Sequence, residues 1–516
     1  MENGRTKSKA ETEYSQFINF FCDHSSEEND DGPIVLYSPY LVLSELEGEC
    51  FEWIRRYLAM HNCPRSLLSQ LMRAVFTRFH DKVKLSDYYV EMEAQQTNYN
   101  TDGGTDEDKN VQPQLDAAKL LSKVLSEVKE TLLSWKHSPP TYTSNLSNFL
   151  VSSYAIKNTR RKMEDKHVLI TDLNTLYGLN NCPPQSYFAI FDGHGGLEAA
   201  TYAATHLHGH LVTDHNFACD PGLAMKQAYK TTDYSFVQKA KREDLRSGTT
   251  GISVLIRGSD VHLGWLGDSQ AIIVQSGKPV KIMEPHKPER EDEKRRIEAL
   301  GGCVLFIGTW RVNGNIAVSR AIGDITHKPF ISSDADVTSF QLTTQDEYIV
   351  IACDGLWDVL DPLQVTHLVY DHVQSSSDDI VGVANILVNA AKDKGSSDNI
   401  SVIVVFFKTG LADPNNTHLP LGLNELRDTL PTSAPERIDT LPPSAPEMRG
   451  TLPSSACNSS SAANDKSNMQ TKDSSASSIS LESSLGLSNH SSQVLASQSH
   501  IKLGRVTSCH KVKLKS

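Results

Sequence analysis

Two segments in the first part of the chain carry the apolar spacing of amphipathic helices. In Ser66–His80, apolar residues recur at intervals of three or four positions, and Gln114–Trp135 repeats this pattern. Such spacing places one apolar stripe along each helix. The stripes are expected either to pack within the protein's own fold or to form a docking module for a partner. The acid-rich first fifty residues are expected to begin as a flexible tail, and the polar residues 95–114 to form a loop.

The middle of the chain alternates short apolar runs with helical patterns, which predicts an α/β domain between about residues 146 and 410. Runs rich in β-branched and aromatic residues predict strands at Tyr187–Phe191, Ile252–Ile256, Val261–Leu266, Ala271–Val274, Tyr348–Cys353 and Ile400–Phe407. Helical patterns separate them at Leu197–Leu211, Pro221–Lys241, Pro288–Leu300, 362–374 and 379–393. Proline at the start of Pro288–Leu300 and two glycines just past its end are the expected helix punctuation.

The last part of the chain, from about residue 411, is rich in serine, proline and asparagine. Such a composition buries too little apolar surface to offset chain entropy, so residues 411–516 are expected to be disordered. A repeat begins at Thr429, Thr440 and Thr451, and its prolines exclude a continuous helix. The chain therefore divides into an acidic, partly helical extension (1–145), a central domain (146–410) and a tail (411–516).

Charge and cysteine usage exclude several classes of protein. The formal net charge is −13, which argues against a general nucleic-acid binder. The nine cysteines form no CxxC pair, so neither a zinc cluster nor a disulfide scaffold is expected, and a reducing compartment fits. The polar first residues suggest no secretory signal, and no apolar run suggests a membrane span. We expect a soluble cytoplasmic protein that is also compatible with the nucleus.

Acidic residues gather at or beside the ends of the predicted strands. They are Glu164, Asp165, Asp192, Asp268, Asp354, Asp358 and Asp398. Asp192 and Asp354 each follow an apolar strand and precede a glycine. Many carboxylates in one place repel each other unless divalent cations neutralise them. Oxygen ligands without clustered cysteine or histidine favour Mg²⁺ or Mn²⁺ over Zn²⁺.

Seven segments resemble those of the metal-dependent protein phosphatases of type 2C, in the same order. They are RRKMED, FAIFDGHGG, SGTTG, WLGDSQA, RVNGNIAVSRAIGD, CDGLWDV and SSDNISV. Together they span about residues 150–408, roughly half of the chain. The resemblance implies two antiparallel β-sheets stacked face to face with helices on both outer sides. It also implies a two-metal site at one end of this sandwich.

The resemblance further implies a role for each residue of the metal core. Asp192 would bridge both metals, and Gly193 would lend its backbone carbonyl. Glu164 would hold one metal, directly or through water. Asp354 and Asp398 would hold the other metal.

Three more acids match outer positions of the family's site. The resemblance implies that Asp165 supports the metals through waters. Asp268 and Asp358 match a weaker third metal site. Taken alone, each has an ordinary structural explanation: a surface charge pair for Asp165, a turn cap for Asp268 and a helix N-terminal acid for Asp358.

Two residues would turn such a metal site into a phosphatase. Arg160 matches the phosphate-binding arginine; Arg161 is the alternative, but the four-residue spacing before Glu164 favours Arg160. His194 matches the proposed general acid, since imidazole titrates in a suitable range. The implied reaction is hydrolysis of phosphoserine or phosphothreonine on proteins by a hydroxide that two metals activate, without a phospho-enzyme intermediate.

Within this family, the chain is similar to the calcium/calmodulin-dependent protein kinase phosphatases, also called partners of the PIX exchange factors. The basis is the acidic helical extension and TWRVNGNIAVSRAIGD followed by His327-Lys328-Pro329. This similarity implies calmodulin-dependent or p21-activated kinases as substrates, and a PIX-type exchange factor bound through the N-terminal region. Two rival interpretations are an inactive scaffold and another two-metal hydrolase such as a phosphodiesterase, whose sites usually mix several histidines with aspartate.

Overall fold

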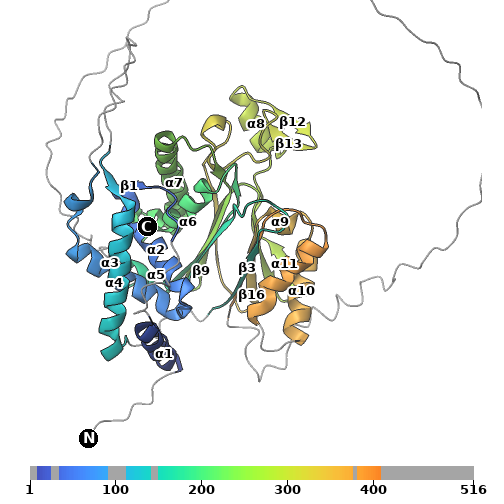
Figure 1. Ribbon diagram of the computed structural model, residues 1–516. Helices are drawn as coiled ribbons and strands as arrows, with labels where there is room; N and C mark the ends of the chain where they lie inside the picture. Colours follow the sequence, from blue (N-terminus) through green and yellow to red (C-terminus); the bar gives the residue numbers. More distant parts are fainter. Residues whose placement is uncertain (1–8, 25–33, 91–111, 141–148, 376–379, 408–516) are drawn as a thin grey trace, which may run out of the picture. The chain divides into compact units, whose positions relative to one another are not determined.

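Two five-stranded antiparallel sheets form the centre of the protein. The computed structural model describes residues 9–24, 34–90, 112–140, 149–375 and 380–407 (Figure 1). The first sheet has the order β11 (Lys278–Lys281), β10 (Gln270–Gln275), β16 (Asp346–Ala352), β17 (Ile400–Phe406) and β3 (Leu150–Ile156). The second has the order β15 (Asp336–Gln341), β9 (Asp260–Leu266), β8 (Gly251–Arg257), β5 (Gln185–Phe191) and β4 (Lys166–Ile170).

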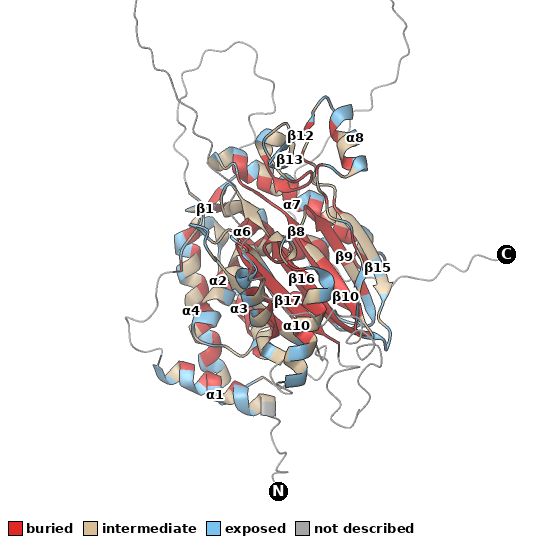
Figure 2. Cartoon of the chain, turned by 90° about the vertical axis from the view of Figure 1, so that its right-hand side faces the viewer, coloured by how far each residue is buried: buried red, intermediate tan, exposed pale blue. Residues whose placement is uncertain are grey.

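The two sheets stack face to face. Alternate residues of each strand point to opposite sides, so one set of side chains from each sheet fills the space between them. Phe188 and Ile190 of β5 share one buried cluster with Ile349 and Ile351 of β16. The intervening residues of β5 join a different cluster on the outer face. Figure 2 shows the central strands almost entirely buried. Burial on both faces makes these strands near-continuous apolar runs, and this is why the sequence reveals six of them.

Helices cover both outer faces, which confirms the expected architecture (Figure 1). The outer face of the first sheet packs against α10 (Pro362–Ser375) and α11 (Val383–Asp393), which follows the short η5 (Ile380–Gly382). The outer face of the second sheet packs against α6 (Glu198–Thr213) and α7 (Pro221–Glu243). All four helices match predicted segments within a few residues. The fifth predicted helix is α8 (Glu291–Ala299), which begins three residues later than expected.

Shorter elements connect these layers, and the sequence did not predict them. Three two-residue strands form a small sheet, with β7 (Gly248–Thr249) between β14 (Ile322–Gly323) and β6 (Gly193–His194). A hairpin joins β12 (Val304–Ile307) to β13 (Thr309–Val312). The short helices are α5 (Leu173–Tyr177), α9 (Asp354–Trp357) and η4 (Ile325–His327). In the described part of the chain, no helix combines the length and apolar character that a membrane span requires.

The N-terminal region contains more helix than the sequence predicts. Its elements are α1 (Lys9–His24), β1 (Tyr40–Val42), η1 (Leu43–Glu45), α2 (Leu46–Met60), α3 (Arg65–Lys82), η2 (Leu85–Tyr88), β2 (Gln114–Asp116) and α4 (Ala117–His137). The prediction of α3 is confirmed. The predicted helix at Gln114–Trp135 is wrong at its start, because Gln114–Asp116 pairs with β1 and the Asp116 carboxylate caps α4 by accepting from Lys119 N.

The expected flexible start is also wrong where the structure describes it. Helix α1 buries Phe17, Ile18 and Phe21, and α2 buries most of one face. These apolar residues outweigh the acidic composition on which the expectation rested. The acidic run at residues 27–31, most of the expected loop at 95–114 and the tail from 411 lie outside the described residues.

The N-terminal helices share one hydrophobic cluster with the outer face of the second sheet. Phe51 of α2 meets the edge of Tyr177 of α5, with ring centroids 5.7 Å apart. The backbones of α2 and α6 approach so closely that a Cβ on Gly48 would lie 2.4 Å from His206 Nδ1. Near the end of α7, the Arg242 guanidinium donates to the carboxylate of Glu45, a buried residue that immediately precedes α2. The helical region and the sandwich are therefore packed as one body of residues.

This shared core predicts that a single substitution in α2 destabilises the sandwich. Phe51 is 2% exposed, so Phe51→Ala should lower the free energy of unfolding by about 3–5 kcal/mol in urea denaturation. Phe20→Ala on α1 is the control; Phe20 is 62% exposed, and a change below about 0.5 kcal/mol is expected. An early, separate unfolding step of the helical region would contradict the shared core.

Candidate metal centre

Four aspartates meet at one edge of the sandwich, where the strands that carry them begin or end. Asp165 precedes β4 and Asp192 follows β5; the register pairs Lys166 with Phe191 and so brings the two acids together. Asp268 and Asp354 lie just beyond the ends of β9 and β16.

Their donor atoms form two groups that share one residue. Oxygens of Asp192, Asp268 and Asp354 lie within 4.8 Å of one another, and the same limit holds for Asp165, Asp192 and the Cys353 sulfur. Asp192 thus stands at the centre of the cluster, as a bridging ligand would.

Burial and mutual repulsion keep these carboxyls from ionising easily. Burial, followed by the charges of Asp165 and Asp354, raises the pKa of Asp192 well above its usual range. Burial is also the largest cause that raises the pKa of Asp354 to about 8, and those of Asp165 and Asp268 to about 6. One oxygen of Asp354 is buried and has no hydrogen-bond partner among the residues that the structure describes. Cations would neutralise the charges and satisfy that oxygen, so these residues fit a divalent-metal site with oxygen ligands.

Asp398 lies beside the cluster but outside both donor groups. Its carboxylate accepts from Arg160 Nη2 at 2.5 Å and from Asn399 N at 2.7 Å. Besides burial and Asp268, the charge of Asp398 raises the pKa of Asp354, so Asp398 acts on the cluster electrostatically. The Arg160 side chain is 58% exposed, which leaves much of its guanidinium open to a ligand.

Glu164 and Gly193 are brought together through the backbone. A Cβ on Gly193 would lie 2.6 Å from the Glu164 carbonyl oxygen, so only glycine fits this approach. Asn399 fixes the Glu164 segment, because its Oδ1 accepts from Glu164 N at 2.8 Å. Its Nδ2 donates to the carbonyls of Lys157 and Lys162, on either side of Arg160. Asn399, to which the sequence assigned no role, thus holds the loop that carries the arginine.

His194 has a buried carboxylate partner that the sequence analysis missed. His194 Nε2–H donates to Asp324 Oδ2 at 2.8 Å, and Asp324 is 3% exposed. Burial alone would lower the pKa of His194, but the hydrogen bond and charge of Asp324 raise it above its usual value. Gly248 permits this pair, since a Cβ there would overlap both side chains. The signal was present in the sequence, where Asp324 ends the segment RVNGNIAVSRAIGD.

Asp358 and Arg161 lie farther out. The Asp358 side chain is 60% exposed and its oxygen lies 3.9 Å from Lys287 Nζ. Burial is the largest cause that raises the pKa of Asp268, the charge of Lys287 lowers it, and the charge of Asp358 raises it further. Asp358 therefore lies at the rim of the cluster. Arg161 is exposed.

Known protein phosphatases match this part of the chain in sequence. Residues 149–400 match the family described as Protein phosphatase 2C, and all the residues named above lie in that range. Human Protein phosphatase 1E is 46% identical over 376 residues, which cover 72% of this chain and 47% of that protein. Human Protein phosphatase 1F is 42% identical over 383 residues, which cover 74% of this chain and 84% of that protein. The chain thus spans about half the length of the first relative.

A solved structure of a C. elegans sex determining protein shares the fold. It covers 78% of this chain and 96% of its own, with a TM-score of 0.61 and 22% sequence identity. The match to human Protein phosphatase 1F, most of whose length is covered, is the stronger evidence for common descent. The chain belongs to the protein phosphatase 2C family.

Proposed function

We propose that this protein is a metal-dependent protein serine/threonine phosphatase. The observation that carries the proposal is the shared position of Asp192 in both donor groups, with the exposed Arg160 close by. Both human relatives are named protein phosphatases, which supports the same class of reaction. In the described part of the chain, the donor groups contain carboxylates and a thiol but no histidine, which disfavours a histidine-rich phosphodiesterase site. The complete set of carboxylates disfavours an inactive scaffold.

The cations that fit this site are Mg²⁺ or Mn²⁺, two in the centre and a weaker third. Asp192, Asp354 and Asp398, with Glu164 and the Gly193 carbonyl, would hold the central pair. Asp165 would support them through waters, and Asp268 and Asp358 would serve the third. When bound, such cations neutralise the carboxylates and lower the pKa of a coordinated water.

Arg160 is suited to hold the phosphate group of the substrate. A guanidinium can donate two parallel hydrogen bonds to phosphate oxygens. One nitrogen of Arg160 is already fixed by Asp398, so the ion pair orients the remaining donors instead of consuming them. Asn399 further restrains the loop on both sides. Arg160 would therefore neutralise charge that spreads over the phosphate in the transition state.

His194 is suited to give a proton to the leaving serine or threonine oxygen. A general acid must be protonated at the working pH, and Asp324 raises the pKa of His194 in the required direction. The same carboxylate fixes the orientation of the imidazole ring. Asp324 is thus a positioning residue that acts through His194.

The substrates and partners that we propose are kinases of the calmodulin-dependent and p21-activated classes, and a PIX-type exchange factor, in the cytoplasm. The N-terminal region offers a surface for docking. Val35, Tyr37, Tyr40 and Leu43 are all between 40% and 59% exposed, and they lie in the segment 35–43 that precedes α2. Arg56 lies over the Tyr37 ring at 5.4 Å and holds this segment against α2. This exposed segment would let the helical region bind a partner while its buried faces remain packed.

The metal assignment predicts that Asp192→Asn abolishes activity. Release of phosphate from a phosphopeptide with Mn²⁺ should fall by more than about 100-fold, because even outer-shell changes at metal sites cost 10–100-fold. Binding of Mn²⁺ measured by calorimetry should weaken in parallel. Asp393→Asn, at the exposed last residue of α11, is the control and should leave both unchanged. A variant at Asp192 that keeps the wild-type rate would refute the metal centre.

Substitution of Arg160 should lower the activity far more than substitution of its neighbour Arg161. Arg160→Ala should lower kcat/KM on a phosphopeptide by about 10²–10³-fold, as for removal of one transition-state donor. Arg161→Ala should change it by less than about twofold, as for an ordinary surface site. Both side chains are exposed, so thermal unfolding should confirm that both variants are folded. The reverse ranking would transfer the phosphate role to Arg161.

The pair of His194 and Asp324 predicts a shift in the pH profile. A general acid loses activity as pH rises through its pKa, and Asp324 raises that pKa. Asp324→Asn should therefore move the alkaline limb of kcat to lower pH, by about one unit or less for one lost charge. His194→Gln should flatten this limb. An unchanged limb in both variants would assign the proton to another group.

If kinases dock on the exposed segment, substitutions there should lower kcat/KM on a kinase but not on a short phosphopeptide. The double variant Tyr37→Ser, Leu43→Ser should lower kcat/KM on a phosphorylated calmodulin-dependent kinase by about tenfold, as expected for interface hot spots. The rate on a short phosphopeptide should not change. Tyr234→Ser, at a 67% exposed site on α7, is the matched control. Equal rates of the double variant and wild type on the kinase would exclude docking at this surface.

A further inference from the structure

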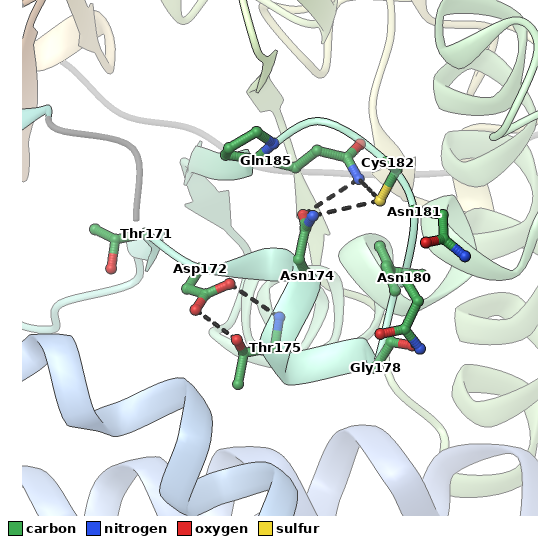
Figure 3. Close-up of a pocket in the computed structure, with 11 residues that line it drawn as sticks. Thr171, Asp172, Asn174, Thr175, Gly178, Asn180, Asn181, Cys182 and Gln185 are labelled. Atoms are coloured by element: carbon green, nitrogen blue, oxygen red, sulfur yellow. Dashed lines mark hydrogen bonds between the residues drawn. The ribbon is translucent and has the colours of Figure 1, made fainter. Parts of the chain in front are cut away.

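A cavity lies at the opposite end of β5 from the metal centre. Its volume is about 500 Å³, within the range of small-ligand sites, and its walls come from α5 and the loop that precedes β5 (Figure 3). Gln185 is the first residue of β5, whereas Asp192 follows the last, so roughly 20 Å of extended strand separates the two sites. The walls consist mainly of amide and hydroxyl side chains.

One wall holds the thiol of Cys182 between two side-chain amides. Asn174 Nδ2 donates to Cys182 Sγ at 3.3 Å, and Gln185 Nε2 donates to the same sulfur at 3.6 Å (Figure 3). The orientation of the Asn174 amide is fixed, because Nδ2 also donates to the Pro183 carbonyl at 2.9 Å. With the amide in this orientation, Asn174 Oδ1 accepts from Gln185 Nε2. Two N–H donors on one sulfur stabilise negative charge that develops there during reaction.

The same wall contains a buried acceptor without a partner. Gln185 is 1% exposed and lines the cavity, and its Oε1 has no hydrogen-bond partner among the described residues. The Gln185 side chain extends along the cavity wall toward Cys182 (Figure 3). An unpaired buried carbonyl is costly, so a ligand that donates an N–H or O–H would be stabilised next to the sulfur.

The other described free cysteines lack this environment. Burial raises the pKa of the thiols of Cys22, Cys50, Cys63 and Cys353. Cys303 is exposed, but its Sγ donates to Asn313 Oδ1 at 3.6 Å, so the sulfur faces an acceptor where Cys182 faces two donors. Cys182 therefore combines access to a cavity with donors directed at the sulfur, and Cys303 is the natural comparison.

We propose that Cys182 is a site of reversible modification by low-molecular-weight peptide disulfides. The Cys182 sulfur attacks one sulfur of the disulfide R–S–S–R, and a new S–S bond forms as the old one breaks. The leaving R–S⁻ takes the electron pair and the proton that Cys182 loses. Cys182 is oxidised to the mixed disulfide, and the released half is reduced to R–SH. The amide-rich walls and Gln185 Oε1 accommodate the peptide-like group R.

The test uses the full chain and oxidised glutathione as the probe. After timed incubation, free thiols are blocked by alkylation, and the glutathionylated fraction of each cysteine peptide is measured by mass spectrometry. Cys182 should react faster than Cys303 by on the order of tenfold, from two hydrogen bonds to the sulfur. A Cys303 rate equal to or above that of Cys182 would overturn the proposal.

Variants test whether the amides cause the reactivity. Gln185→Met keeps the length of the side chain but removes its N–H, and should slow Cys182 by several-fold. Asn313→Ala is the matched control at Cys303 and should leave the Cys182 rate unchanged. Thermal unfolding and phosphatase activity verify that both variants are folded. An unchanged rate in folded Gln185→Met would show that the amide does not activate the sulfur.

A second probe separates the cavity from the thiol. Methyl methanethiosulfonate also forms a mixed disulfide but carries no peptide group. The preference for Cys182 over Cys303 should be larger with oxidised glutathione than with this small reagent. Equal or smaller preference with glutathione would refute the assignment of peptide-like ligands to the cavity.

Discussion

The structure depends on placing several carboxylates together at one buried edge of a sandwich. Like charges at this distance oppose ionisation, and burial opposes it further, so the pKa of Asp354 reaches about 8. Strands on both sheets keep the acids from moving apart, since Asp192 and Asp354 follow β5 and β16, which are buried on both faces. The apolar core thus holds an electrostatically unfavourable arrangement in place, and bound cations would relieve it.

The centre of this site could be predicted from sequence, but its supporting contacts could not. Asp192 and Asp354 stand out because an apolar strand leads directly into each acid. The pairing of His194 with Asp324 joins segments 130 positions apart, and no local pattern indicates such a contact. Asn399 is equally hidden, because three hydrogen bonds of its side chain go to backbone groups and depend on how two loops meet. The ion pair of Asp398 with Arg160 likewise depends on the tertiary structure.

The fold also contains elements that the sequence predicts and elements that it does not. Strands such as β5 and β16 have seven buried residues each, with continuous apolar runs, and were found, whereas β12 and β13 have four residues each, most of them exposed or partly exposed. Helix α3 was found from its spacing, but α1 was missed because acidic composition obscured the apolar residues it buries. Composition describes a whole segment, while burial depends on a few positions within it.

The common core of the helical region and the second sheet has a thermodynamic consequence. Gly48 lies directly against His206, so no layer of solvent separates α2 from the helix behind the catalytic sheet. Any ligand that binds only the folded helical surface must therefore stabilise the sandwich by the same free energy, through mass action. The thermal stability of the sandwich would then report occupancy of a distant surface on the helical region. Conversely, loss of such a ligand would return the sandwich to its lower intrinsic stability.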